Sequence, residues 1–195
     1  MNRRTLLASL AIALTMPTIA LAESSSLRCG TATRTFQRPS SPGAGRVNLS
    51  VEVRRQGGLV APLPTEEAIL APVIAAGHER AGLEFYIVAQ DTLSPPPELD
   101  LEAIFVTWSS LEGAAAVPRC GGIAVLRDGG TQWTIATSDG DASTHVDLLE
   151  TVAMAVSRKR ADTGPDLVDL LPTEDDLPAG WELATERVTP APCER

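Results

Sequence analysis

The chain is poor in several residue types that carry chemistry in proteins. Its 195 residues include three Trp, one Tyr, three Phe, two His and three Cys. Lys159 is the single lysine. So few aromatic side chains are mostly needed for a core, which argues against a surface on which bases or sugar rings stack. Amine chemistry has one candidate residue, and it stands between two arginines where a solvated helix end is expected.

Short reaction motifs are also missing from the sequence. There is no Walker loop, dinucleotide fingerprint, H-E-x-x-H motif or G-x-S-x-G nucleophile elbow. The cysteines are too far apart for the short spacing of a zinc site. The formal charge of −9 repels nucleic acid and anionic lipid. We therefore expect no nucleic acid partner, and no motif predicts a reaction.

The first 22 residues have the form of an export signal. Arg3 and Arg4 precede an apolar run that ends in a small-x-small pattern, Ala20-Leu21-Ala22. We predict cleavage after Ala22; a membrane anchor is the alternative, but Pro17 interrupts the run. Removing 22 of 195 residues leaves 173, with 14 basic and 25 acidic side chains and a formal charge of −11. This predicts an acidic, secreted or periplasmic domain without a stable membrane anchor.

Three cysteines in an exported chain favour one disulfide and one remaining thiol. Cys29, Cys120 and Cys193 lie far apart, and the sequence alone does not determine their pairing. The tripeptide Arg-Cys-Gly occurs around both Cys29 and Cys120, each time before a strand-like run. On this pattern we expect a Cys29–Cys120 disulfide.

Alternating hydrophobicity predicts an antiparallel sheet. In residues 46–54 the apolar side chains alternate with a polar set, which gives a strand with one wet face. That polar set is Arg46, Asn48, Ser50, Glu52 and Arg54. Residues 101–108 are apolar on both faces and are predicted to be central. Residues 122–137 form a hairpin around Asp128-Gly129-Gly130, with Trp133 in the core.

Two helices are predicted. One spans residues 65–80, capped by Thr65, and Pro72 should kink or split it. The other spans about 142–160; at 100° per residue its apolar residues form one broad stripe. His145 falls within that stripe near the positive end of the helix, so we expect it to be neutral and partly buried.

These elements predict one α+β domain, a mainly antiparallel sheet of about four to six strands with both helices packed on one face. We assign residues 1–22 to the cleaved signal and 23–45 to a mobile N-terminal segment. Residues 46–163 form the α+β domain. Residues 164–195 form a partly packed tail that Trp181 anchors.

The stretch 139–150 resembles a calcium loop in its spacing. Counting Asp139 as position 1 of an EF-type loop, the ligand positions hold oxygen-bearing side chains, namely Asp139, Asp141, Ser143, Asp147 and Glu150. Thr144 stands where the loop needs glycine, and a strand precedes it where an EF-hand has a helix. The alternative is a turn at Asp139-Gly140 followed by a helix cap. No other cofactor is expected.

Three hypotheses about function follow. The first is an extracytoplasmic binding or protein-interaction domain that uses the wet face of the sheet to hold an unknown extracellular or periplasmic ligand or protein. The second is an exported hydrolase whose site is assembled around His145, with Asp139 or Asp141 as its acid–base partner. The third is a calcium-stabilised domain that uses residues 139–150. The first fits best, because no catalytic signature is present.

Overall fold

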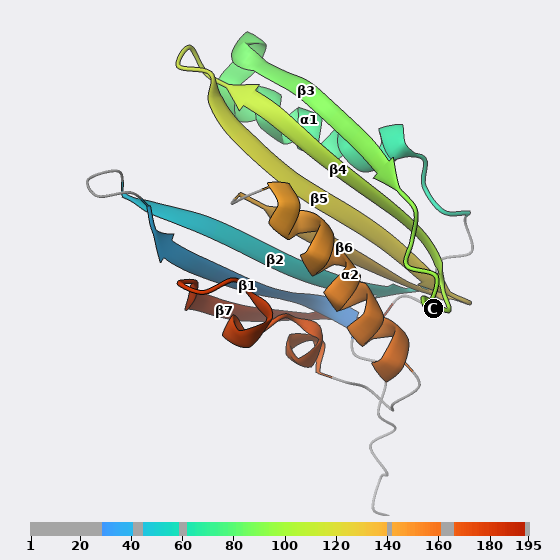
Figure 1. Cartoon of the computed structure of the whole chain (residues 1–195). Helices are drawn as coiled ribbons and strands as arrows, with labels where there is room; N and C mark the ends of the chain where they lie inside the picture. The colour runs from blue at the N-terminus through green and yellow to red at the C-terminus, as the bar shows by residue number, and fades with distance from the viewer. Residues whose placement is uncertain (1–28, 41–44, 59–61, 140–141, 161–165, 194–195) are drawn as a thin grey trace, which may run out of the picture.

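The structure, a computed structural model, describes residues 29–40, 45–58, 62–139, 142–160 and 166–193. Seven strands form one sheet in the order β3-β4-β5-β6-β2-β1-β7, and every neighbouring pair is antiparallel (Figure 1). The strands are β1 (Cys29–Pro39), β2 (Arg46–Gly57), β3 (Phe85–Leu93), β4 (Glu102–Glu112), β5 (Val117–Asp128), β6 (Thr131–Ser138) and β7 (Glu182–Ala191). The α+β class is confirmed.

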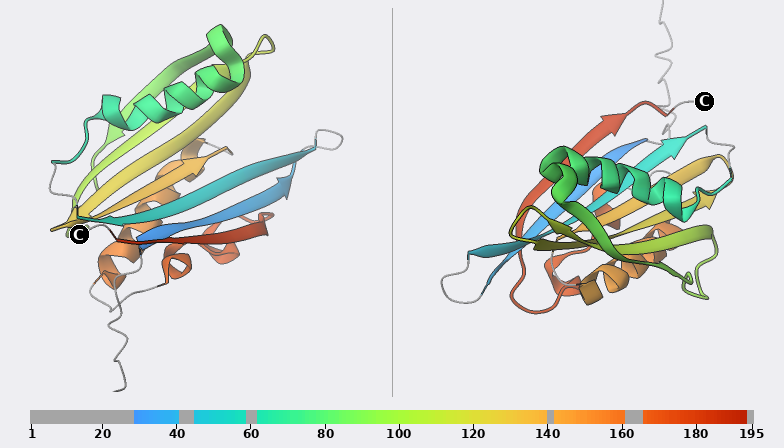
Figure 2. Two further views of the ribbon diagram at one scale, coloured as in Figure 1. Left: turned by 180° about the vertical axis from the view of Figure 1, so that it is seen from behind. Right: turned by 90° about the horizontal axis from the view of Figure 1, so that it is seen from above.

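Helices α1 (Glu66–Ala81) and α2 (Ala142–Lys159) pack on opposite faces of the sheet (Figure 2). Successive residues of a strand point to opposite faces. Accordingly Phe105 on β4 joins the core around α2, while its neighbour Val106 joins the core beneath α1. The prediction that both helices share one face is therefore wrong. A strand that is apolar on both faces needs cover on both.

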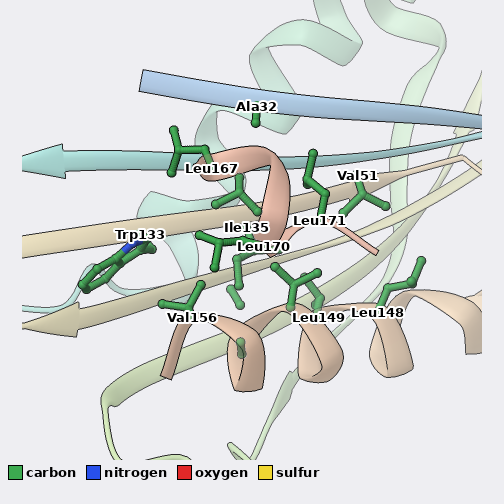
Figure 3. Close-up of a cluster of buried hydrophobic side chains, with 14 of the residues drawn as sticks. Ala32, Val51, Trp133, Ile135, Leu148, Leu149, Val156, Leu167, Leu170 and Leu171 are labelled. Atoms are coloured by element: carbon green, nitrogen blue, oxygen red, sulfur yellow. The ribbon is translucent and has the colours of Figure 1, made fainter. Parts of the chain in front are cut away.

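The larger core lies between the sheet and α2. Side chains of β1, β2, β4, β5 and β6 converge on the apolar stripe of α2, and short turns at η2 (Leu167–Leu170) close the same core (Figure 3). The predicted hairpin, with Trp133 in the core, is confirmed, since β5 pairs with β6 and Trp133 is buried. Asp128 pairs with Thr131, which places Gly129 and Gly130 at the turn. The apolar stripe of α2 thus packs against β5, which carries Cys120, and β6, which carries Thr137.

The sheet extends beyond the predicted domain at both ends of the chain. β1 lies inside the segment predicted to be mobile and pairs with β2 over ten residues, from Gly30 to Pro39. β7 lies inside the predicted tail and pairs with β1. Boundaries at 46 and 163 are therefore too narrow. The N-terminal strand β1 and the C-terminal strand β7 pair with each other at one side of the sheet. The local sequence pattern of neither segment reveals this pairing.

Helix α1 begins as predicted but is not interrupted. The Thr65 side chain accepts a hydrogen bond from the Ala68 amide at 3.3 Å. Pro72 lies inside an unbroken helix, so the predicted kink or split is wrong. Pro72 and Ala68 are both exposed. Water can therefore satisfy the carbonyl that loses its intrahelical partner, which lowers the cost of proline there.

The disulfide joins Cys29 to Cys193, not Cys29 to Cys120 as the repeated tripeptide suggested. Cys29 begins β1, and Cys193 follows the end of β7, its antiparallel neighbour. The two Cα atoms are 5.0 Å apart. Cys120 lies on β5, which β6 and β2 separate from β1. The pairing of the cysteines depends on this strand order, which no local pattern in the sequence reveals.

Candidate ligand pocket and thiol site

The predicted wet face of the sheet is uncovered over half its width. α1 covers strands β3 and β4 on the outer face, while β6, β2, β1 and β7 carry no helix of the described residues there (Figure 2). Arg46, Asn48 and Arg54 are exposed, and Ser50 and Glu52 are half-buried. The cross-strand partners of this set on β1 are Pro39, Gln37, Thr35, Thr33 and Thr31. The face presents hydroxyl and charged groups to solvent.

A pocket with a volume of about 430 Å³ lies where β2 finishes, and its lining includes residues from both faces of the strand. Residues 54–57 of β2 form one wall, and the start of β1 with Ala191 and Pro192 forms the other. The Cys29–Cys193 disulfide ties these two chain ends together. Gly30 has φ of 150°, and a Cβ there would stand 2.5 Å from the Thr189 carbonyl oxygen. The close approach of β7 to β1 therefore requires glycine.

Arg55 is the unusual residue of this pocket. Its side chain is on the face opposite Arg54, and the residue is 4% exposed. Its Nε is buried without a hydrogen-bond partner, and it forms no ion pair with any described residue. The guanidinium lies over the Trp133 ring, 5.5 Å from the centroid. Burial lowers the pKa of Arg55 below its usual value, but an arginine remains charged at neutral pH.

A buried cation without an acidic partner is costly, because it has lost its hydration and gained no counter-charge. The Trp133 ring offsets part of this unfavourable free energy, because it makes a cation–π contact with the guanidinium. Arg54 adds a second guanidinium at the pocket, only loosely paired with Glu52 at 3.6 Å. The pocket therefore has the charge and donor groups to take a small anion.

A second group of chemically active side chains surrounds His145 on α2. Its Nε2 lies 3.2 Å from the Sγ of Cys120, and its Nδ1 lies 3.0 Å from the Oγ1 of Thr137. The Thr137 hydroxyl in turn donates to the Gly122 carbonyl oxygen at 3.3 Å. His145 is 1% exposed, whereas Cys120 is half-buried. The structure thus assembles a cysteine, a histidine and a threonine from β5, α2 and β6.

Two glycines of β5 allow this assembly. A Cβ on Gly122 would stand 2.7 Å from the Leu149 Cδ1 atom, so α2 approaches β5 more closely than a side chain would permit. Gly121 has the Thr137 carbonyl oxygen at 2.5 Å and the Trp108 ring at 2.6 Å from its Cβ position. Cys120 shares the face of Gly122, because side chains alternate along a strand. His145 therefore meets the thiol.

The predicted acid–base partner of His145 is engaged elsewhere. Asp139 Oδ1 accepts a hydrogen bond from Arg119 at 2.6 Å, and Arg119 also lies 3.7 Å from Glu112. Glu112 accepts from Arg80 of α1 at 2.6 Å, and this hydrogen bond raises the pKa of Arg80. Asp139 thus belongs to a charge network with Arg119, Arg80 and the buried Glu112. Asp141 lies outside the described residues.

The calcium loop stays a prediction. Asp139 has a left-handed φ of 64°, Asp147 is exposed on α2 and Glu150 is half-buried. Residues 140–141 and the Ser143 side chain lie outside the described residues. Within the described part of the chain, no group of three His, Cys, Asp or Glu is placed to hold a metal ion.

A calcium titration tests that loop directly. If residues 139–150 form a site, 1 mM calcium should raise the Tm of the EDTA-treated protein, because a ligand that binds only the folded state stabilises it. For a Kd of about 10 μM the gain is about 2.7 kcal/mol. Asp147→Ala should abolish the rise, since Asp147 is an exposed ligand candidate outside the Arg119 network. Asp175→Ala, another exposed aspartate, is the matched control. A melt unchanged by calcium would exclude the loop.

Sequence reasoning placed His145 correctly within the apolar stripe but missed its neighbours. Cys120 was expected in a disulfide, and nothing linked Thr137 to either residue. The alternation of side chains along a strand could have indicated them. Gly122 pairs with Thr137 across the hairpin, and Cys120 lies two residues before Gly122, on the same face. Arg55 gave a sharper signal. It continues the apolar parity of Val51 and Val53, and that parity could have placed a charge on the buried face.

No protein-family model matches the chain, and no curated protein matches it. Among solved structures, CalU16 from Micromonospora echinospora is similar over 70% of this chain and 89% of that chain, with 12% sequence identity and a TM-score of 0.25. A likeness at that TM-score bears neither on the fold nor on the function. No helix of the described residues is long and apolar enough to span a membrane.

Proposed function

We propose that the chain is an extracytoplasmic binding domain whose ligand is a small anion bearing a carboxylate or phosphate group. The predicted export signal and the Cys29–Cys193 disulfide support an oxidising compartment. The exposed polar face of β2 supports the use of the sheet for binding. The observation that carries the proposal is Arg55, a buried residue in the lining of a pocket of about 430 Å³ whose guanidinium has no acidic partner among the described residues.

The ligand class follows from the donor groups. A guanidinium binds carboxylate and phosphate in a planar, two-point geometry. Arg55 supplies the buried charge, Arg54 a second charge, and Thr31 and Gln56 supply neutral polar groups at the same pocket. The net charge of the chain repels anions, so binding requires a local positive site. An anion in this pocket would pair with Arg55 and remove the cost of its burial.

The test is the effect of anions on thermal unfolding. At a ligand concentration 100 times Kd, binding should stabilise the purified, oxidised protein by about 2.7 kcal/mol. Phosphate, succinate and chloride should be compared at equal ionic strength, because phosphate also stabilises proteins non-specifically by exclusion from their surface. Binding to the pocket gives a saturating rise in Tm. Succinate and phosphate together separate carboxylate from phosphate preference.

Two variants distinguish pocket binding from a general salt effect. Arg55→Met should abolish the saturating rise and should leave the protein at least as stable without ligand, because replacing a buried charge by an apolar side chain of similar size is neutral or stabilising. Arg187→Gln, an exposed arginine on β7, should keep the rise. If Arg55→Met retains the full response, or if wild type shows none to either anion, the proposal fails.

A further inference from the structure

We propose that Cys120 is a reactive thiol, with His145 as its base, that forms mixed disulfides with small disulfides bearing carboxylate groups. The site lies at the opposite end of β2 from the Arg55 pocket and does not depend on anion binding there. Three observations carry it: a histidine nitrogen at the sulfur, a hydrogen-bond chain that sets the tautomer of that histidine, and a pocket lined by the cysteine and two arginines.

The hydrogen bonds around His145 decide which of its nitrogens accepts a proton. The Thr137 hydroxyl gives its hydrogen to the Gly122 carbonyl, so its oxygen remains to accept from His145 Nδ1–H. In the neutral ring the other nitrogen, Nε2, then carries a lone pair. That lone pair faces the Cys120 sulfur at 3.2 Å. Thr137 is therefore a positioning residue, and His145 can take the thiol proton.

Cys120, which is half-buried, and its base His145 border two different pockets. A pocket with a volume of about 340 Å³ includes Cys120, Arg46, Asn48, Arg119 and Asp139 in its walls. It forms where β6 ends at Ser138 and leaves β2 and β5 to diverge (Figure 1). His145 is 1% exposed, so a reagent in this pocket has access to the half-buried Cys120 more readily than to the imidazole. The size of the pocket favours a small reagent.

The charges at the pocket select the reagent. Arg46 and Arg119 line it, and among its described lining residues Asp139 is the one carboxylate. Arg119 pairs with Asp139 and also lies 3.7 Å from Glu112. On the other side of His145, Asp91 of β3 lines a smaller pocket of about 210 Å³ together with Thr107 and Ser109. Arg46 hydrogen-bonds to Gln37 and forms no ion pair with a described residue, so its charge favours a disulfide with anionic groups. Small disulfides are also the oxidised form of thiols that an oxidising compartment contains.

The reaction is a thiol–disulfide exchange without net oxidation. His145 Nε2 accepts the Cys120 proton, and the thiolate attacks one sulfur of the small disulfide. The new Cys120 sulfur–sulfur bond forms as the old one breaks. The released thiolate takes the proton back from the imidazolium and leaves as a thiol. One disulfide is consumed and one is formed, and His145 returns to its neutral state.

The first experiment measures this exchange by intact-mass spectrometry, with oxidised glutathione at pH 6. Wild type should gain one glutathione per chain, and Cys120→Ser should gain none. His145→Gln should slow the reaction on the order of 10-fold at pH 6, because few unassisted thiols are ionised there, and should approach the wild-type rate at pH 9. His78→Gln, an exposed histidine near the end of α1, should react like wild type.

The second experiment tests the pocket and does not require a variant that disturbs the core. Wild type should react faster with oxidised glutathione than with the neutral bis(2-hydroxyethyl) disulfide. Arg46→Gln should reduce that preference, measured as the ratio of the two rates, at least 2-fold. Equal rates of His145→Gln and wild type at pH 6 would overturn the role of His145. No adduct on the folded wild-type protein would overturn the whole proposal.

Discussion

Removing the disulfide, by Cys29→Ser together with Cys193→Ser, is expected to lower the free energy of unfolding by about 5 kcal/mol. The bridge closes nearly the whole domain, because its two cysteines are 164 residues apart. A cross-link that closes a long loop restricts the unfolded chain most, and by the chain-entropy model a loop of this length gives roughly 5 kcal/mol. Urea unfolding of the variant and of wild type measures the difference. In a thermal melt it corresponds to a fall in Tm of at least about 10 °C.

Cys120→Ser is the matched control for this prediction. It changes the third cysteine and leaves the bridge intact, so its unfolding should keep the wild-type sensitivity to reductant. The double variant should be insensitive to reductant, because no disulfide remains to reduce. If Cys120→Ser instead removes the reductant sensitivity and costs several kcal/mol, the pairing first expected from the repeated Arg-Cys-Gly tripeptide is correct in solution. The two variants therefore decide between the two disulfide patterns.

Local patterns in the sequence predict the elements of this fold, and long-range pairing decides the rest. The alternation in residues 46–54, the glycine turn after Asp128 and the stripe of α2 depend on neighbours along the chain, and all three predictions are confirmed. The pairing of β1 with β7 joins segments about 150 residues apart. No local pattern encodes such contacts. The predicted domain boundaries were too narrow for this reason.

The helix placement was predictable from information already on the chain. Residues 101–108 are apolar on both faces, and a strand of that kind needs cover on each side. In the structure, α2 covers the face that carries Phe105, and α1 covers the face that carries Val106. The prediction of both helices on one face conflicted with this pattern. The candidate sites show a similar division: parity could place Arg55 on the buried face, but its lack of an acidic partner depends on the fold.

Trp181→Ala is expected to lower the free energy of unfolding by about 3–5 kcal/mol, the usual cost of deleting a large aromatic side chain from a core. Trp181 is 5% exposed and belongs to the same core as α2. Arg38 of β1 lies over its ring, 4.8 Å from the centroid. Trp181 therefore packs the segment before β7 into the core and, through Arg38, against β1.

The variant also distinguishes a partly packed tail from an integral part of the domain. If residues 166–193 are integral, Trp181→Ala shifts a single urea transition that far-ultraviolet and near-ultraviolet circular dichroism report alike. A tail that detaches alone would instead leave the midpoint almost unchanged and open β7 to proteolysis in the native state. Leu183→Ala, at an apolar residue that is 43% exposed two positions further on, is the matched control and should cost less than about 1 kcal/mol. We expect one shifted transition, because Leu167, Leu170 and Trp181 share the core that holds α2 against Cys120 and Thr137.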